Sequence, residues 1–467
     1  MGIKRFLSAG LLMAGIMALF FGCDKEITEE GTPVVDGSNG KLLSLTASAQ
    51  DFINMETGTR ASESGTTLSF QSGDEIGVFG VKNGSLVCNN LRFTTTNGST
   101  WSGPETYHES GTTYFAYYPY EAGMNGKTSL AAIQSEFESR LNGNPDQSSQ
   151  ANYMTYSKLL VSTSGSVSPS GDRLSFRFKH ALAMVEVVLP DKLEGTMSAN
   201  GKNFPLYTPS SLSITASFSL SSTSVSFYNI SGKTYRRVVK PGTGLNFKAT
   251  LCNAFNYTDN STVNAGSYKK FTLGNVSETI RIGDFAYGKN SGTLAFYPGS
   301  TTTDAPDKDN CIGVVATVGN QYNRSDSYTH GTVVAKNDCP TGFWVFENGV
   351  DRSAIVNSYS PKAPSGTTGW YLPGKAELYY LCTGRYDSSF DAKPGDAPSD
   401  NRVTAMKKTL NSFFAKSGGN AWADSSVDRY IAGSSAAYSE YDYILFFGVG
   451  SFGLTTSANH ARLCFAF

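Results

Sequence analysis

Residues 174–190 read LSFRFKHALAMVEVVLP, and this stretch indicates the class of fold. Apolar and polar side chains alternate strictly from Leu174 to Phe178, which is the pattern of a strand with one buried face. A second apolar run extends from Ala183 to Leu189. Pro190 ends it, because proline cannot donate a backbone hydrogen bond within a sheet. We therefore expect two strands here and a domain boundary at Pro190.

Short strands of the same kind recur on both sides of this stretch. Toward the N-terminus they are predicted at residues 42–49, 68–70, 76–79, 91–93 and 114–120, with Gly, Asp, Ser and Thr between them. On the other side one face of a period-two pattern holds Leu212, Ile214, Ala216, Phe218 and Leu220. Regular short strands indicate a β-sandwich or barrel. No helix of useful length is expected before residue 370.

The last third of the chain has a different pattern. Gly369-Trp370-Tyr371-Leu372-Pro373 leads into a short amphipathic helix at residues 375–381. A longer helix is predicted at residues 401–416, followed by Gly418-Gly419 as its cap. Its apolar face holds Val403, Met406, Leu410, Phe413 and Phe414. Short β runs at residues 443–447 and 461–467 close the chain, so this part is expected to be α+β.

The N-terminus predicts an export signal. Lys4-Arg5 precede an apolar run from Phe6 to Phe21, which has the length of a signal peptide and is too short to span a bilayer. Cys23 directly follows this run and Gly22, as in the lipobox of bacterial lipoproteins. Residues 1–22 are therefore predicted to be a signal peptide, Cys23 to be acylated, and residues 23–41 to form a flexible tether. Asp24-Lys25-Glu26 resembles the tag of Bacteroidetes lipoproteins that face the medium, although a plain polar linker would read the same.

Composition limits the function classes. A chain of 467 residues predicts about three domains at ~150 residues each. The net charge of -1 and the lack of a basic stripe argue against nucleic acid as a partner. Aromatic residues make up 12% of the chain and charged residues only 16%, a balance typical of β-rich extracellular proteins. Export would permit disulfides, above all among the last four of Cys88, Cys252, Cys311, Cys339, Cys382 and Cys464, but spacing cannot give their pairing.

No catalytic, cofactor or metal site is predicted. The chain has neither a Cys-x-x-Cys pair nor a Gly-x-Ser-x-Gly elbow, and its four histidines are scattered. Asp304, Asp307 and Asp309 alternate as in a calcium loop, but the glycine and glutamate of that motif are missing. We therefore expect a protein that is not an enzyme.

Tyrosines near the C-terminus are the candidate ligand-binding residues. Tyrosine combines a large rigid surface with a hydroxyl group at little entropic cost, which suits recognition of sugars or proteins. The alternative is an ordinary β-rich loop. The candidates are Tyr430, Tyr438, Tyr441 and Tyr443.

An ordered set of motifs in residues 42–272 resembles the fimbrillin family of type V pili in Bacteroidetes. The set consists of Phe70-x-x-Gly73-Asp74-x-Ile76-Gly77-Val78-Phe79, Trp101, Tyr117-Tyr118-Pro119-Tyr120, Met154-Thr155-Tyr156 and Phe178-x-His180-Ala181-Leu182-Ala183. The resemblance implies two transthyretin-like β-sandwich domains in tandem, at residues 42–190 and 191–273. It also implies proteolytic maturation between Arg60 and Ala61, followed by donor-strand exchange with other pilin subunits. The alternative reading of Arg60 is a chance arginine in an exposed linker.

Residues 274–467 resemble the lectin-like C-terminal domains of some surface proteins, which are C-type-lectin-like α+β folds. The matching pieces are Ile282-Gly283-Asp284-Phe285, Cys311-Ile312-Gly313-Val314-Val315, His330-Gly331-Thr332-Val333-Val334-Ala335, Gly369-Trp370-Tyr371-Leu372-Pro373 and Ala461-Arg462-Leu463. The chain lacks a Glu-Pro-Asn or Gln-Pro-Asp triplet, and it has Ala432-Gly433-Ser434-Ser435 where relatives tend to carry a tryptophan. The sequence therefore does not support calcium-dependent sugar binding.

These features predict a surface-exposed lipoprotein of the outer membrane and fimbrium. The expected role is a pilus tip or accessory adhesin that mediates cell adhesion, with pilin subunits and a surface glycan or protein as partners. The alternative is a free-standing surface lipoprotein that binds glycan or protein without polymerising.

Overall fold

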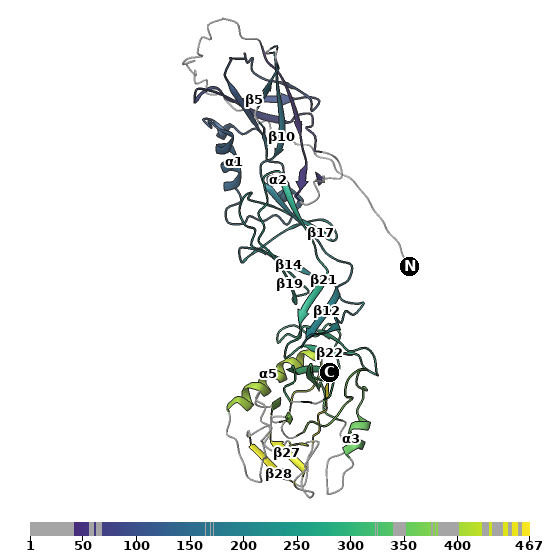
Figure 1. The fold of residues 1–467 in the computed structure, drawn as a ribbon. Coiled ribbons are helices and arrows are strands. Elements are labelled where there is room, and N and C mark those ends of the chain that lie inside the picture. The colour runs from purple at the N-terminus through teal and green to yellow at the C-terminus, as the bar shows by residue number, and fades with distance from the viewer. Residues whose placement is uncertain are drawn as a thin grey trace, which may run out of the picture.

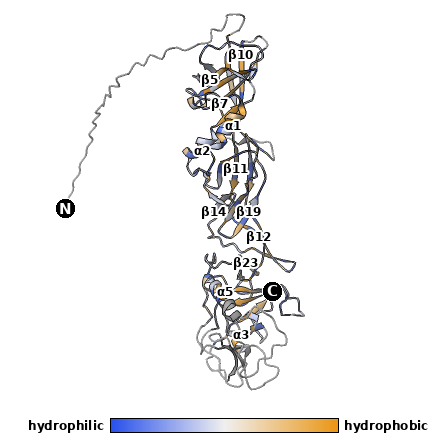
Figure 2. Ribbon diagram, turned by 90° about the vertical axis from the view of Figure 1, so that its left-hand side faces the viewer, coloured by the Kyte–Doolittle hydropathy of each residue, from blue (hydrophilic) through white to orange (hydrophobic). Residues whose placement is uncertain are grey.

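The protein is elongated and mainly β, with 41% of residues in strands and 12% in helices in a computed structural model. The N-terminal sheet, the middle sheets and the C-terminal part follow one another along the long axis (Figure 1). Figure 2 shows hydrophobic residues in strands along this whole length. The structure describes residues 42–55, 60–61, 68–163, 165–168, 170, 172–322, 324, 326–339, 352–374, 377–378, 380–381, 401–422, 429–431, 442–446, 451–455 and 460–467.

The N-terminal strands form one sheet that closes on itself. Strand β1 (Ser44–Ala49) pairs antiparallel with β6 (Thr100–Ser102) and parallel with β10 (Arg173–His180), and so joins the two ends of the sheet. The closed sheet surrounds a core that includes Phe70, Trp101 and Phe178. Between β6 and β10 the order is β5 (Ser85–Thr95), β4 (Glu75–Lys82), β7 (Thr113–Tyr118) and β8 (Leu160–Ser162). Strand β9 (Ser166–Val167) pairs with the first half of β10, and β8 pairs with its last residues.

Two helices in the N-terminal part show that the prediction of no helix before residue 370 was wrong. Helix α1 (Leu130–Ser139) begins after Ser129, whose side chain caps the Ala132 N–H, and α2 (Gln150–Ser157) begins in the same way after Ser149. On α1 only Ile133 and Phe137 are fully buried, so its apolar stripe is too narrow to stand out in the sequence.

The middle of the chain holds three sheets. The largest has the order β16 (Tyr228–Ser231), β17 (Thr234–Val239), β11 (Ala183–Val188), β20 (Ser267–Thr272), β2 (Phe52–Asn54) and β3 (Arg60–Ala61). It takes β11 from before Pro190 and β2 and β3 from the N-terminal segment. The smaller sheets have the orders β13 (Lys202–Pro205), β12 (Glu194–Ala199), β21 (Asn275–Thr279), and β15 (Thr223–Val225), β14 (Ala216–Leu220), β18 (Phe247–Leu251), β19 (Phe255–Asp259). Strand β14 begins only at Ala216, so Leu212 and Ile214 precede it.

A buried ion pair ties the central strands of the largest sheet together. Glu186 of β11 faces Arg236 of β17 in the strand register, and the guanidinium Nε and Nη2 both lie 2.8 Å from its carboxylate. Lys270 of β20 approaches the same carboxylate at 3.2 Å from the other side. The carboxylate is thus held between cations from both neighbouring strands, which compensates the cost of burying it.

The C-terminal part contains both strands and helices. Its main sheet has the order β23 (Ala295–Tyr297), β22 (Phe285–Tyr287), β24 (Gly313–Val318), β25 (Gly331–Ala335) and β29 (Cys464–Ala466), and a second sheet consists of β26 (Arg429–Ile431), β27 (Asp442–Phe446) and β28 (Ser451–Thr455). Helix α3 (Arg352–Ser358) and helix α5 (Asn401–Ser417) accompany them. Residues 377, 378, 380 and 381 are helical, in the place of the predicted short helix.

Aromatic side chains join the middle and C-terminal parts. Tyr207 stacks on Tyr287 with ring centroids 3.6 Å apart, and its hydroxyl donates to Asp307 at 2.7 Å. Phe204 packs edge to face against Phe296 and Phe467. One continuous hydrophobic core therefore runs from β11 to the last residue.

The described cysteines carry free thiols, so the disulfides expected from export are not formed among them. Cys88, Cys252, Cys311, Cys339 and Cys464 are all buried. The Cys311 thiol donates to the Gly313 carbonyl at 3.5 Å, and burial raises its pKa to about 12. These thiols pack as small apolar side chains. Cys382 lies outside the described residues.

Helix α5 (Asn401–Ser417) packs against β24 through the face that the sequence predicted. Leu410 and Phe414 are fully buried, and the half-buried Phe413 ring fills the space in front of Gly283. Val403 and Met406 belong to the same predicted face, but their side chains lie outside what the structure describes. Among the described residues, no helix has both the length and the apolar character needed to cross a bilayer.

Replacing Leu410 by alanine should lower the free energy of unfolding by ~2–5 kcal/mol, because it removes a buried side chain and leaves a cavity between α5 and β24. Denaturant unfolding followed by circular dichroism measures this loss. Lys408→Ala is the control, since Lys408 is exposed on the same helix and should change stability by less than about 0.5 kcal/mol. Equal effects of the two substitutions would contradict the packing assigned to α5.

Candidate functional site

Strand β1 is the first element of the candidate site, because it is held on both edges. All six of its residues pair with β10, from Ser44 opposite Arg173 to Ala49 opposite Phe178. The N–H of Gln50 donates to the Phe178 carbonyl and extends the pairing with β10, and the N–H of Leu43 donates to the carbonyl of Thr106, which follows β6. A strand in this position satisfies the backbone of two neighbours at once, so its loss would leave two open edges.

The residues that follow β1 pass into the middle part of the molecule. Phe52 is fully buried, and its ring lies on the imidazole of His180 with centroids 3.6 Å apart and planes 6° from parallel. Strand β2, which contains Phe52, pairs parallel with β20. The segment from residue 42 to residue 55 therefore fills the seam of the N-terminal sheet and also covers the core between that sheet and the middle sheet.

His180 forms the floor under Phe52. Its Nδ1 lies 2.7 Å from the Ser157 carbonyl at the end of α2, so that nitrogen carries the proton and donates. Complete burial lowers the pKa of His180 to about 3, against the weaker opposing effect of this hydrogen bond. A neutral, flat imidazole is a suitable partner for an aromatic ring. The contact depends on both residues being shielded from water.

Arg60 and Ala61, the predicted maturation site, form strand β3 at the edge of the largest middle sheet. They pair antiparallel with Ile53 and Phe52. The sequence predicts an exposed loop here, whereas the structure shows a two-residue strand that pairs with β2 on one side only. Residues 56–59 and 62–67 on either side lie outside the described residues. The bond between Arg60 and Ala61 thus lies in extended backbone at the edge of a sheet.

Of the predicted ligand-binding tyrosines, Tyr430 and Tyr443 lie in strands of the C-terminal part. Tyr430 is only 1% exposed, with its ring stacked between Trp422 and His460 at centroid distances of 5.5 and 5.1 Å. The structure therefore places Tyr430 in the core of the C-terminal part. Tyr443 lies in β27, where only its backbone is described, and Tyr438 and Tyr441 lie outside the described residues.

A half-buried carboxylate, Asp338, lies beside Tyr430. It accepts hydrogen bonds from the Tyr430 hydroxyl at 3.2 Å and from Arg462 Nε at 2.6 Å, and His460 Nδ1 is 3.2 Å away. Burial opposes ionisation of Asp338, but the hydrogen bond with His460 and the charge of Arg462 outweigh it and lower the pKa of the carboxyl group. This cluster fastens β26 to the closing segment of the chain.

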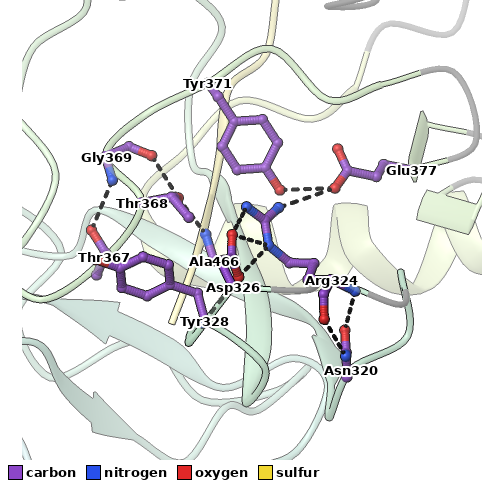
Figure 3. A network of polar contacts seen from close by, with 10 residues as sticks. All are labelled: Asn320, Arg324, Asp326, Tyr328, Thr367, Thr368, Gly369, Tyr371, Glu377 and Ala466. Atoms are coloured by element: carbon purple, nitrogen blue, oxygen red, sulfur yellow. Dashed lines mark hydrogen bonds and ion pairs between the residues drawn. The ribbon is translucent and has the colours of Figure 1, made fainter.

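A second polar network, shown in Figure 3, centres on Arg324. Its guanidinium Nη2 lies 2.7 Å from Asp326, and Nη1 lies 3.5 Å from Glu377. Tyr371 donates to Glu377 at 3.2 Å, and nearby the Ala466 N–H donates to the Thr368 hydroxyl at 2.9 Å. Burial raises the pKa of Glu377. The sequence did not reveal this network, because Glu377 lies about fifty residues from Arg324 and Asp326 and the three residues match no motif.

In both networks the polar groups bond to one another. Within the described ranges no group of three or more His, Cys, Asp or Glu residues could hold a metal ion. The aspartates that alternate in the sequence have other partners: Asp304 pairs with Lys308 and Lys416, and Asp307 accepts from Tyr207 and Asn310. These ion pairs and hydrogen bonds hold neighbouring elements of the fold together.

Comparison with known proteins gives matches to fimbrial proteins. A family model described as fimbrillin-like matches residues 59–303, more than half of the chain. A relative from Bacteroides ovatus, named as a candidate fimbrium tip subunit, Fim1C, is 30% identical over 423 residues, which cover 82% of this chain and 74% of the relative.

Solved structures were compared as well. A fimbrial protein from Bacteroides ovatus is 23% identical, with 92% of this chain and 99% of that chain covered and a TM-score of 0.35. The tip fimbrial protein Mfa3 from Porphyromonas gingivalis is 10% identical, with 47% and 80% covered and a TM-score of 0.23. On the sequence matches, the chain belongs to the fimbrillin-like family of fimbrium-associated surface proteins, and it is a structural protein rather than an enzyme.

Proposed function

We propose that this chain is a fimbrial subunit that accepts a strand from a neighbouring subunit after cleavage between Arg60 and Ala61. The observation that carries the proposal is the pairing of β1 on both of its edges. Removing residues up to Arg60 would open the closed sheet and leave unpaired N–H and C=O groups along β6 and β10. An incoming strand restores these bonds, as in other cases of recognition by strand addition.

Burial of apolar side chains would also favour binding of a donated strand. Leu43 and Leu45 are 9% and 4% exposed, and Phe52 is fully buried. Burying one such side chain stabilises by ~1.5–3 kcal/mol, so an empty seam would expose a costly apolar groove. A neighbour's strand with apolar residues at alternate positions would cover it.

The closing strand supports a place at the pilus tip. Strand β29 pairs with β25 inside its own sheet, and residues 461–467 are all buried. The Phe467 N–H donates to Gly331, and the His330 N–H donates to Phe467. A strand held in this way is not available to fill a neighbour's groove. We therefore infer a subunit that accepts a strand and does not donate this one, in agreement with the name of the relative from Bacteroides ovatus.

The proposal also includes a division of the chain into three domains. Two transthyretin-like domains at residues 42–190 and 191–273 would serve assembly, and a C-type-lectin-like domain at residues 274–467 would serve adhesion to a surface glycan or protein. The C-terminal part lies at the opposite end of the long axis from the seam of β1, where it could reach a partner without blocking assembly (Figure 1). Acylation at Cys23 would anchor the exported chain to the outer membrane before maturation.

An arginine-specific protease should release one N-terminal fragment that ends at Arg60, because β3 is short and paired on one side only. Mass spectrometry identifies the fragment, and size-exclusion chromatography follows assembly of the cut protein. Arg60→Gln is the control and should remain intact at this site. If the cut protein stays monomeric and binds no added strand, the free-standing surface lipoprotein becomes the better description.

A peptide of residues 42–60 should bind back to the cut protein, and its Phe52→Ala form should bind about a hundredfold more weakly, because the substitution removes the ring stacked on His180. Fluorescence anisotropy of labelled peptides measures both affinities. Ile53→Ala is the matched control, since Ile53 is 36% exposed and should change binding by only a few fold. Equal losses for the two peptides would contradict the role given to Phe52.

Cys23→Ala should move the protein from the membrane fraction to the soluble fraction of fractionated cells, because stable anchoring requires the acyl chains. Cys382→Ala is the control and should leave the protein with the membranes. Continued membrane association of the Cys23→Ala protein would overturn the lipobox reading while leaving the strand-exchange proposal intact.

A further inference from the structure

A polar cavity of about 250 Å³ lies where the N-terminal and middle parts meet. Its walls come from the turn after α1, from the turn between β14 and β15, and from the end of β17. The cavity is lined by Asn142, Asn144, Ser221, Arg237, Lys240 and Thr243, among others. Asn142, Ser221 and Thr243 are exposed at its rim, whereas Arg237 is buried, so the cavity opens to solvent above a buried cation.

Arg237 has unused hydrogen-bonding capacity. Its side chain is 1% exposed, yet it contacts only neutral acceptors: Nη1 donates to the Ser226 carbonyl at 2.6 Å and Nη2 to the Pro145 carbonyl at 3.1 Å. Nε has no hydrogen-bond partner. A guanidinium group carries five N–H donors in a planar fork, so the donors beyond these two bonds, the buried Nε among them, have no acceptor among the described protein groups.

The positive charge of Arg237 is not neutralised by a bonded carboxylate. Burial lowers the pKa of Arg237 to about 10, which still leaves the group charged at neutral pH. Asp146 is the nearby acid, but the described bonds of its oxygens are to Ser148, Asn152 and Ser226. The other two buried arginines of the described chain each hold a carboxylate, Arg236 with Glu186 and Arg462 with Asp338. Arg237 is the exception among them.

A second cation lies in the same wall. Lys240 lines the cavity, is half-buried, and donates to the side-chain oxygen of Asn142. No acidic residue is among the residues that line the cavity. Two cations around a water-accessible space, one of them buried without an anionic partner, favour an anion because a buried charge is costly until it is paired.

We infer that this cavity binds a small oxyanion, such as a carboxylate, sulfate or phosphate group, through Arg237 and Lys240. The guanidinium fork binds such a group at two points, and the ammonium group adds a point charge. Asn142, Asn144, Ser221 and Thr243 offer neutral polar contacts to whatever carries the group. The shared chemistry fits a free inorganic ion or the acid group of a sugar. The site lies outside the β1 seam and does not depend on strand exchange.

Isothermal titration of the purified protein with sodium sulfate, phosphate, acetate and glucuronate, against sodium chloride at matched ionic strength, tests this inference. We expect saturable 1:1 binding of at least one oxyanion and a matching rise in the unfolding temperature. Binding of glucuronate would identify an acidic sugar as the class of ligand, and binding of sulfate or phosphate alone would identify an inorganic ion.

Substitutions locate the site. Arg237→Gln should abolish binding, and Lys240→Gln should weaken it at least tenfold. Lys248→Gln is the control, because Lys248 is exposed on β18 and does not line the cavity, and it should bind as the parent does. If Arg237→Gln does not fold, the comparison of Lys240→Gln with Lys248→Gln decides. Absence of saturable binding, or equal binding by the Lys240 and Lys248 variants, would mean that the cavity holds only water.

Discussion

Strand β1 holds the N-terminal sheet closed because its backbone pairs with β6 on one edge and with β10 on the other. Each remaining strand of that sheet needs this closure, since the apolar side chains of Phe70, Trp101 and Phe178 point into the space that β1 seals. Phe52 extends the effect, because it packs on His180 between the N-terminal and middle parts. The segment of residues 42–55 thus contributes to two hydrophobic cores, with Leu43 and Leu45 in one and Phe52 in the other.

The N-terminal, middle and C-terminal parts are connected by shared strands and by a continuous hydrophobic core. The largest middle sheet shares β2 and β3 with the N-terminal segment, and the core that begins at β11 continues to Phe467. The Tyr207–Tyr287 stack and the Phe204, Phe296 and Phe467 contacts fix the C-terminal part to the middle part. A load applied at the C-terminal part would therefore pass through packed aromatic rings into paired strands.

Buried charges divide into two groups. Glu186 with Arg236, and Asp338 with Arg462, are paired in the way that makes burial tolerable, and they fasten neighbouring elements. Arg324, which is only partly buried, also lies between two carboxylates, those of Asp326 and Glu377. Arg237 bonds only to two backbone carbonyls. Arg237 therefore differs from the other two buried arginines in having no bonded carboxylate, which is the basis of the oxyanion site inferred above.

The sequence by itself determined the β class, the positions of several strands, among them β1, β4, β7, β10 and β11, and helix α5, since alternation and the 3.6-residue period are local patterns that burial imposes on the chain. The strand predicted at residues 68–70 was wrong, because the structure shows irregular backbone there. The sequence did not reveal α1 and α2, whose buried faces hold only a few residues, nor the extended state of Arg60, which depends on pairing with β2. Tertiary structure alone decided that β1 pairs parallel with a strand about 130 residues away, that Tyr430 is in the core, and that Arg237 and Lys240 share one cavity. Such contacts follow from the way the chain closes on itself, and no local pattern records them.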